Sequence, residues 1–226
     1  MVVAKVAMTI AAPPPQRKPK TVEDRLREHG AKVDERLRPL FAARKISYPP
    51  AKLTLLGLKD EKKLEVYAAD QSNVWRMIKS YDVLAASGTM GPKMREGDRQ
   101  VPEGIYKISL LNPNSLYHLS LRVNYPNEFD RRMASEDGRT RLGGDIMIHG
   151  NAVSIGCVAI GDEGAEDLFV LAARTGLPNI SVILSPLDFR KRRLPVNTPG
   201  SPKWIEELYS SIQHELNHYP PDMRLD

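Results

Sequence analysis

The fold of this chain is decided by the stretch DIMIHGNAVSIGCVAIGD, residues 145–162. Alternation at its start places Ile146 and Ile148 on one face of a β-strand and His149 on the other, because successive side chains of a strand point to opposite faces. Gly150 follows, where the backbone can turn sharply. A second short strand over 158–160 returns into the core. The pattern predicts two strand ends side by side, each carrying a reactive side chain.

The second reactive side chain is Cys157, the single cysteine of the chain, and Gly156 stands directly before it. A glycine there lets a substrate carbonyl approach closely and leaves backbone N–H groups available to hold an oxyanion. An imidazole beside a thiol can accept its proton, so Cys157 is expected to be richer in thiolate near neutral pH than an isolated cysteine. The pattern favours Cys157 as a nucleophile with His149 as its base. A buried structural cysteine is the alternative.

Outward from this stretch, short strand-like segments recur between residues 53 and 186. Apolar runs or period-two alternation occur at 53–58, 63–70, 75–87, 105–111, 117–125 and 180–186. Residues 88–104 hold four glycines and two prolines, which predicts an ordered loop. Many short strands with a few helices outside them predict an α+β fold with a mainly β core.

Helical spacing appears in three places, and two of them carry candidate N-terminal caps. Thr21 with Asp24 three residues later forms a variant of the capping box. Asp162 is a candidate cap for the helix that follows it. The predicted helices cover 21–44, 163–175 and 204–218, the last of them stopped by two prolines.

The positive charge of the chain is concentrated near its start. Residues 1–45 hold 11 Lys/Arg against 5 Asp/Glu, whereas residues 46–226 hold 22 against 23. Attraction of the N-terminal arm to an anionic polymer or membrane surface is one interpretation, and a solvated helix face is the other. No nucleic-acid-binding motif accompanies the charge, so no nucleic-acid partner is expected.

The segments IHG (148–150) and SIGC (154–157) resemble the YkuD-type L,D-transpeptidase catalytic domain family, and in particular its YafK-like branch. In that branch the two segments are separated by only a few residues. The resemblance covers roughly residues 37–190. It extends to LEVY (64–67), to 85–106, to LNPNSLYHLSLRVNYPNEFDR (111–131) and to LGGDIMIHG (142–150).

The resemblance implies a mainly β, YkuD-like catalytic domain with peripheral helices. It implies an exported, periplasmic or cell-wall-associated enzyme that acts on peptidoglycan stem peptides without a metal or organic cofactor. Cys157 matches the nucleophile and His149 the base. Gly156 and Cys157 match the positions whose N–H groups hold the oxyanion, Ser154 matches the Ser/Thr of the motif, and Gly150 supports the site.

Two features depart from the family at large. The position before the Gly-Cys pair is usually histidine and here is Ile155, and the gap from His149 to Cys157 is short. The acceptor of the acyl group therefore stays open between an amine of a second stem, which is transpeptidation, and water, which is hydrolysis. The leaving group stays open between D-alanine and a protein amine attached to the cell wall. A non-catalytic cell-wall-binding module is the alternative of another class.

The resemblance and the composition together suggest a division of the chain. Residues 1–20 are expected to be a flexible N-terminal segment or a signal remnant, because proline-rich 13–20 favours an extended linker. Residues 21–50 are expected to form a helix packed on the domain. The catalytic domain is assigned to 51–195 and a helical extension to 196–226.

Other polar residues near the decisive stretch are weaker candidates. His118 faces either the cleft, where it would bind substrate, or an ordinary strand environment. Asp145 lies four residues from His149, ~13 Å along one strand, and is expected to be structural rather than a triad member. Arginine and lysine suit the carboxylates of a stem peptide. The cationic candidates are Lys93, Arg95, Arg99 and Arg122.

The sequence HELNH, residues 214–218, matches the H-E-x-x-H pattern of zinc enzymes. On a helical wheel centred on Ile212, His214 and His218 fall at ~200° and ~240°, away from the apolar face. A catalytic zinc helix turns its histidines inward to a cleft. No metal site is expected there.

Overall fold

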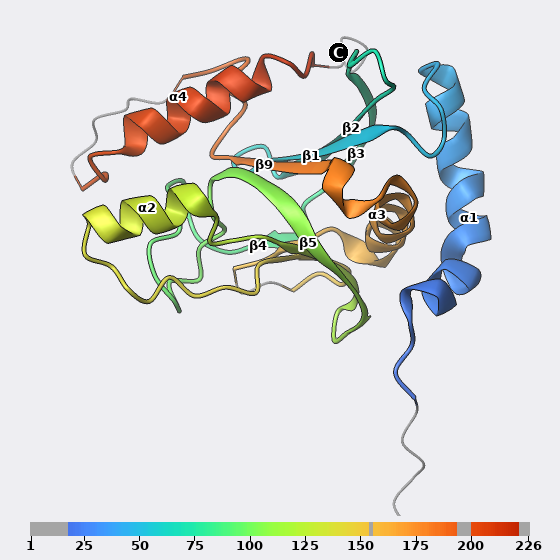
Figure 1. Cartoon of the computed structure of the whole chain (residues 1–226), viewed down its shortest axis with the longest axis horizontal. Coiled ribbons are helices and arrows are strands. Elements are labelled where there is room, and N and C mark those ends of the chain that lie inside the picture. The colour runs from blue at the N-terminus through green and yellow to red at the C-terminus, as the bar shows by residue number, and fades with distance from the viewer. Residues whose placement is uncertain (1–17, 154–155, 194–199, 222–226) are drawn as a thin grey trace, which may run out of the picture.

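Nine strands form one mixed sheet in the computed structural model, which describes residues 18–153, 156–193 and 200–221 (Figure 1). Their order within the described residues is β3-β2-β1-β9-β5-β6-β7-β8-β4. The α+β fold predicted from the sequence is confirmed. The strands are β1 (Lys52–Leu58), β2 (Lys63–Ala69), β3 (Arg76–Asp82), β4 (Ala85–Ala86), β5 (Gly104–Ser115), β6 (His118–Val123), β7 (Met147–His149), β8 (Val158–Ala159) and β9 (Ile180–Ser185).

The centre of the sheet is built from strands that are distant in sequence. β9 lies between β1, to which it is parallel, and β5, to which it is antiparallel. β5 continues through the antiparallel β6 to β7, and β7 is parallel to β8. Because β9 is covered on both faces, its sequence is an almost continuous apolar run rather than an alternating one.

Helices cover both faces of this sheet (Figure 1). The strands send alternate side chains into two separate cores. Val182 and Leu184 join the core of α1 and α3, whereas Ile183 joins the core of α4. Among the described residues, no helix has the length and apolar character needed to cross a membrane. The helices are α1 (Val22–Ala43), α2 (Glu128–Glu136), α3 (Gly161–Thr175) and α4 (Ile205–Leu216), with a short 3-10 turn η1 (Leu177–Asn179) before β9.

Helix α1 is held against α3 by a buried ionic cluster. The carboxylate of Asp167 on α3 is fully buried, and the Nε of Arg36 donates to it at 2.8 Å. Lys79 Nζ and the Tyr81 hydroxyl of β3 donate to the same carboxylate at 2.9 Å and 2.8 Å. A buried carboxylate is tolerated only with such partners. Asp167 therefore joins α1, α3 and the sheet.

Of the two helix caps that the sequence predicted, one is present and one is not. The capping box of Thr21 and Asp24 is confirmed. Asp162, in contrast, lies inside α3 and caps nothing, so that prediction was wrong. Its Oδ1 accepts from the backbone N–H of Asn151 at 2.7 Å, and so it fixes the turn that follows His149.

Helix α2 was not predicted at all. It begins at an Asn127 cap whose side chain accepts from the N–H of Asp130, while Asp130 reaches back to the N–H of Asn127. The same reciprocal arrangement that begins α1 therefore begins α2.

Candidate active site

The parallel pair β7–β8 positions the two residues singled out by the sequence. Ile148 pairs with Val158 and His149 pairs with Ala159. The expectation that the two segments lie side by side is confirmed. The two strands run parallel to each other.

The register places His149 and Cys157 on one face of this pair. Cys157 lies two residues before Ala159, the partner of His149, and side chains two apart share a face. One strand spacing combined with two residues of rise separates their Cα atoms by about 8 Å. That separation is within the combined reach of a cysteine and a histidine side chain.

The imidazole of His149 is 1% exposed and oriented by the backbone. Its Nδ1 lies 2.6 Å from the carbonyl oxygen of Gly150. A carbonyl only accepts, so Nδ1 carries the proton and Nε2 presents a lone pair. Nε2 is buried and has no hydrogen-bond partner among the described residues. Burial lowers the pKa of His149, which keeps the ring neutral and basic near neutral pH.

An aromatic ring covers His149. Tyr117, at the tip of the β5–β6 hairpin, stacks on the imidazole with ring centroids 4.7 Å apart and an interplanar angle of 28°. Sequence reasoning did not assign Tyr117 a role. Nothing in its local sequence could have done so, because the contact depends on the pairing of β6 with β7.

The thiol of Cys157 is half-buried, and its Sγ lies 3.7 Å from the carbonyl oxygen of Asp145. Burial raises the pKa of Cys157 above its ordinary value, and the charge of Asp145 acts in the same direction. A backbone hydrogen bond at Met147 and the charge of Lys93 oppose this rise without cancelling it. Burial therefore favours the protonated thiol, which is the opposite direction to the thiolate-rich Cys157 expected from the sequence.

Glycine is required at positions 150 and 156. A Cβ on Gly150 would lie 2.5 Å from Asp162 Oδ1 and 2.9 Å from the carbonyl oxygen of Tyr117. Gly156 has φ of +91°, in the left-handed region that side chains avoid. Its N–H donates to the hydroxyl of Ser87 at 2.5 Å. Ser154, a predicted supporting residue, and Ile155 lie outside the described residues.

The glycine-rich loop over 88–104 is ordered, as the sequence predicted, and it borders Gly156. Asp98 organises the loop by accepting from the N–H groups of Met94 and Arg95, each at 2.9 Å, and of Gln100 at 3.1 Å. The backbone of Gln100 passes 3.7 Å from the position of a Cβ on Gly156. The loop therefore lies directly beside Gly156.

The predicted cationic residues differ in their freedom to bind a substrate. Arg122 is 43% exposed, pairs in register with Met147, and contacts Asp145 at 3.0 Å. Lys93 is buried, with its ammonium hydrogen-bonded to the carboxylate of Asp98 and donating to the Arg95 carbonyl at 2.9 Å. Lys93 is therefore committed to the loop and is a poor receptor for a substrate carboxylate, whereas Arg122 is available. Arg95 and Arg99 are exposed on the same loop.

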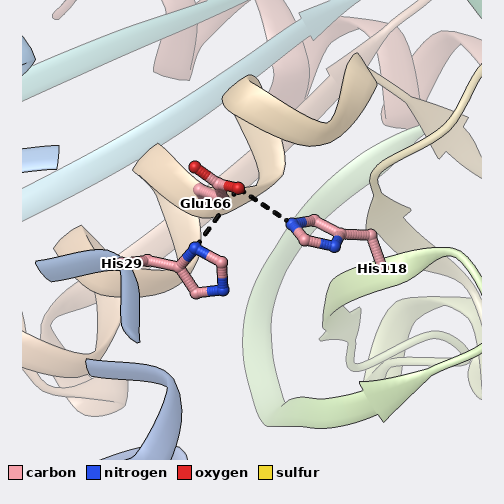
Figure 2. Close-up of side chains that lie close together, drawn as sticks. All are labelled: His29, His118 and Glu166. Carbon is pink, nitrogen blue, oxygen red and sulfur yellow. Dashed lines mark hydrogen bonds and ion pairs between the residues drawn. The ribbon is translucent and has the colours of Figure 1, made fainter. Parts of the chain in front are cut away.

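The side chains of His118 and Asp145 contact residues other than His149 and Cys157. The Nε2 atom of His118 lies 3.1 Å from Glu166 Oε1 on α3, so its ring turns toward the helices (Figure 2). Asp145 is 80% exposed and pairs with Arg122. The expectation that Asp145 stands apart from a catalytic triad agrees with this ion pair. Substrate binding by His118 stays a prediction without a supporting contact.

The H-E-x-x-H segment covers the last turn of α4 and the two residues that follow it, and both of its histidines face outward. His214 and His218 are exposed, while Ile212 and Leu216 are buried against the sheet. The helical-wheel prediction for this segment is confirmed.

Comparison with known proteins identifies relatives across this region. The family model of the YkuD L,D-transpeptidase catalytic domain matches residues 56–184. "Putative L,D-transpeptidase YafK" of Escherichia coli strain K12 is 33% identical over 133 residues, which are 57% of this chain and 51% of that protein. Its counterpart from Escherichia coli O157:H7 matches equally. The chain spans about half the length of the curated relatives it matches.

Solved structures share the fold at lower identity. The helical cell shape determining protein Pgp2 of Campylobacter jejuni superposes with a TM-score of 0.50 and 19% identity, over 75% of this chain and 70% of that one. Its K307A mutant gives a TM-score of 0.50 and 21% identity, over 74% and 54% of the two chains. At this identity the likeness shows a shared fold only.

Proposed function

The chain belongs to the L,D-transpeptidase catalytic domain family, whose model covers more than half of it, and on that premise we propose that it is a cysteine acyl-transfer enzyme acting on peptidoglycan stem peptides outside the cytoplasm. The observation that carries the proposal is the placement of a cysteine and a buried histidine on one face of β7–β8, where the histidine Nε2 has no hydrogen-bond partner among the described residues. A nitrogen lone pair buried without a donor costs free energy, and in a native structure such an atom calls for an explanation, of which a catalytic role is one. Accepting the proton of Cys157 is the role that we propose.

The first half-reaction forms a thioester. As the Sγ of Cys157 attacks the carbonyl carbon at an L-configured centre of the stem, its proton passes to Nε2 of His149. Because the thiol starts protonated and the imidazole neutral, attack and proton transfer are coupled, and no preformed ion pair is needed. The Nδ1–H bond to Gly150 then orients the imidazolium. His149 gives the proton to the departing amine as the carbon–nitrogen bond breaks.

The oxyanion is stabilised by backbone N–H groups at the start of β8. The N–H of Gly156 donates to Ser87 in the resting arrangement. Ser87 also donates its own hydroxyl proton to the carbonyl of Arg99 at 2.7 Å, so it has a second partner. We propose that a substrate oxyanion replaces Ser87 at Gly156 and also accepts from the N–H of Cys157. A charge-assisted bond to an anion is stronger than the neutral bond it replaces.

The second half-reaction removes the acyl group from Cys157. An incoming amine of a second stem, or water, gives a proton to His149 and attacks the thioester carbonyl. The thiol is restored when the carbon–sulfur bond breaks and the proton returns to sulfur. The amine route is transpeptidation and the water route is hydrolysis. Arg122, exposed beside Asp145, is placed to receive a stem carboxylate, which arginine binds bidentately.

Trapping of the nucleophile tests this proposal. A carbapenem-type β-lactam, whose ring opening mimics thioester formation, is expected to give a single adduct that peptide mass mapping locates at Cys157. His149→Ala should slow adduct formation by on the order of 10²–10⁴, the usual contribution of a general base. Cys157→Ala should abolish both the adduct and turnover of stem peptides, with the far-UV circular dichroism unchanged.

Two outcomes separate the alternatives. A non-catalytic cell-wall-binding module would retain binding to isolated cell wall, form no adduct in the native state and release no product. Products from crosslinked or amine-substituted stems, read by mass in the presence of excess amine acceptor, distinguish transfer from hydrolysis. Native-state inertness of Cys157 with full turnover by Cys157→Ala would refute the cysteine mechanism.

A further inference from the structure

Three metal-ligating side chains converge at a place that the proposed acyl transfer does not use (Figure 2). His29 comes from α1, His118 from the start of β6, and Glu166 from α3. His29 Nδ1 lies 3.2 Å and His118 Nε2 lies 3.1 Å from the same oxygen, Glu166 Oε1. One ligand atom from each residue lies within 4.8 Å of the other two. Among the described residues, this is the group of three such side chains close enough to share an ion.

The cluster is protected from solvent and constrained by the backbone. His29 is more than nine-tenths buried, and the Glu166 side chain is 17% exposed. His118 has φ of +71°, a left-handed conformation that few non-glycine residues adopt. Strained backbone persists where the surrounding structure determines it, and such positions are common at ligand sites. Here the unusual turn of the hairpin directs the imidazole of His118 at the two helices.

Hydrogen bonding alone leaves this cluster incomplete. Each contact to Glu166 Oε1 needs an N–H, because a carboxylate oxygen accepts and does not donate. With its proton on Nδ1, neutral His29 has a lone pair on Nε2. That atom is buried and has no hydrogen-bond partner among the described residues. Its nearest charged neighbour is Glu28 Oε2 at 3.7 Å, which is an acceptor and not a donor.

We propose that His29, His118 and Glu166 form a binding site for a divalent transition-metal ion, of which Zn²⁺ fits the ligands best. Zinc takes imidazole nitrogen at about 2.0–2.1 Å and carboxylate oxygen at about 2.0–2.2 Å. Ligand atoms at the corners of such a tetrahedron are ~3.3 Å apart. Both contacts of Glu166 Oε1 already have nearly that length. A small approach of the two imidazoles completes the three protein ligands, and water takes the fourth position.

Ion binding would also resolve the hydrogen bonding of His29. When Nδ1 ligates the metal, the proton of the neutral ring moves to Nε2. Glu28 Oε2 then becomes its acceptor after a small side-chain movement. A metal-bound histidine normally donates its other N–H to a carboxylate or carbonyl, which fixes the ring and raises its basicity.

The surrounding ion pairs orient the Glu166 carboxylate toward the two histidines. Arg36 Nη2 contacts the outer oxygen of Glu166, Oε2, at 3.2 Å, and so orients Oε1 toward the histidines. Arg36 is itself neutralised by Asp167 at 2.7 Å. Glu28 is shared with Arg25 at 2.9 Å and with Lys20 at 2.5 Å. Glu166 is therefore the carboxylate ligand of the proposed site, and it shares its charge with Arg36 through Oε2.

Such an ion would join three segments that are distant in sequence. Residues 29, 118 and 166 belong to the N-terminal helix, the β5–β6 hairpin and α3, respectively. Its position also differs from that of the exposed His214 and His218, and its ligand set does not include Cys157. The site is expected to have a structural role.

Titration of the full chain with Zn²⁺ tests the site. Displacement of a chromophoric chelator should show one tightly bound equivalent, and Co²⁺ in its place should give the visible absorption of a tetrahedral ion with nitrogen and oxygen ligands. Cys157→Ala and the double variant His214→Ala/His218→Ala are the matched controls, because they remove the other candidate ligands. Both should keep the tight equivalent. Saturating Zn²⁺ should raise the melting temperature of the wild type, because the ion binds only the folded chain.

Variants at the proposed ligands provide the decisive comparison. His118→Asn removes the imidazole and keeps a residue that tolerates positive φ, and Glu166→Gln removes the charge with little change in shape. Each should weaken Zn²⁺ binding by more than ~10-fold, since loss of an outer-shell partner alone typically costs that much. Circular dichroism establishes that the variants are folded. The proposal is overturned if wild type shows no saturable binding, or if the tight equivalent survives in folded His118→Asn and disappears in either control.

Discussion

Removal of the Tyr117 ring should slow acylation of Cys157 and change its pH dependence. The ring stacks on His149 at 4.7 Å, and such an aromatic pair contributes about 0.5–1.5 kcal/mol beyond its buried area. If that free energy holds the imidazole in its reactive orientation, Tyr117→Ala should lower the rate of adduct formation by ~2–13-fold. The effect is smaller than for His149→Ala because the base itself remains.

The pH profile gives this prediction a second, independent readout. Burial lowers the pKa of His149, and the base works only when neutral, so the rate should fall as the pH decreases through that lowered pKa. Tyr117→Ala exposes the imidazole and relieves part of the desolvation. Its pKa should rise toward the ordinary value, and the acid limb of the profile should move to higher pH. The deficit of the variant is therefore expected to be greater at acidic than at alkaline pH.

Tyr117→Phe is the matched control because it keeps the stacked ring and removes only the hydroxyl. Rates of β-lactam adduct formation, followed by intact-protein mass at a series of pH values, should nearly coincide for Tyr117→Phe and wild type. An unchanged rate and acid limb in Tyr117→Ala would refute the positioning argument. Equal losses in the two variants would show that the hydroxyl, and not the stack, is responsible.

Three further predictions concern regions outside this contact. His214→Ala/His218→Ala should leave turnover of stem peptides nearly intact, because both rings face solvent on α4; loss of activity restored by added zinc would contradict the cysteine mechanism. Deletion of residues 1–17 should leave the rate on a small soluble stem peptide unchanged, and weaken binding to intact cell wall mainly at low salt, where charges are least screened. The third prediction concerns stability and the variant Asp130→Asn. Burial raises the pKa of Asp130 to about 6. The protonated carboxyl of Asp130 therefore contributes to the free energy of unfolding at low pH, and this contribution is lost as the pH rises from about 4 to about 6. Urea unfolding across that range should show a decline in wild type, on the order of 2–3 kcal/mol, that is reduced in Asp130→Asn.

Local sequence pattern was sufficient to predict the strand that carries His149 and the start of α1. Alternation along 145–149 correctly gave the strand that carries His149, because Ile146 and Ile148 are both in the core. The Thr21 cap correctly placed the start of α1, since the capping box is a contact between residues three apart. In both cases the interactions that decide the structure lie within one short segment.

Contacts between distant segments were not accessible to the same reasoning. The position of β9 between β1 and β5 depends on which strands pair, and its apolar run fits any buried strand. α2 was missed although Asn127 and Asp130 form a cap that is visible in the sequence, because no helical spacing was assigned after the strand predicted at 117–125. The raised pKa of Cys157 was missed because burial of a thiol depends on the tertiary packing around it.

The hairpin tip connects the proposed metal site to the proposed base. Tyr117 and His118 are consecutive, yet one stacks on His149 and the other contacts Glu166. Gly150 packs against both, since a Cβ on it would lie 2.9 Å from the Tyr117 carbonyl oxygen and 3.0 Å from the Cβ of His118. Any force that fixes His118 against the helices therefore also fixes the ring that covers His149. His29 lies on α1, which precedes the family-matched residues 56–184. We therefore expect the N-terminal helix to support the proposed active site, and we expect a chain trimmed to the family match to lose this support.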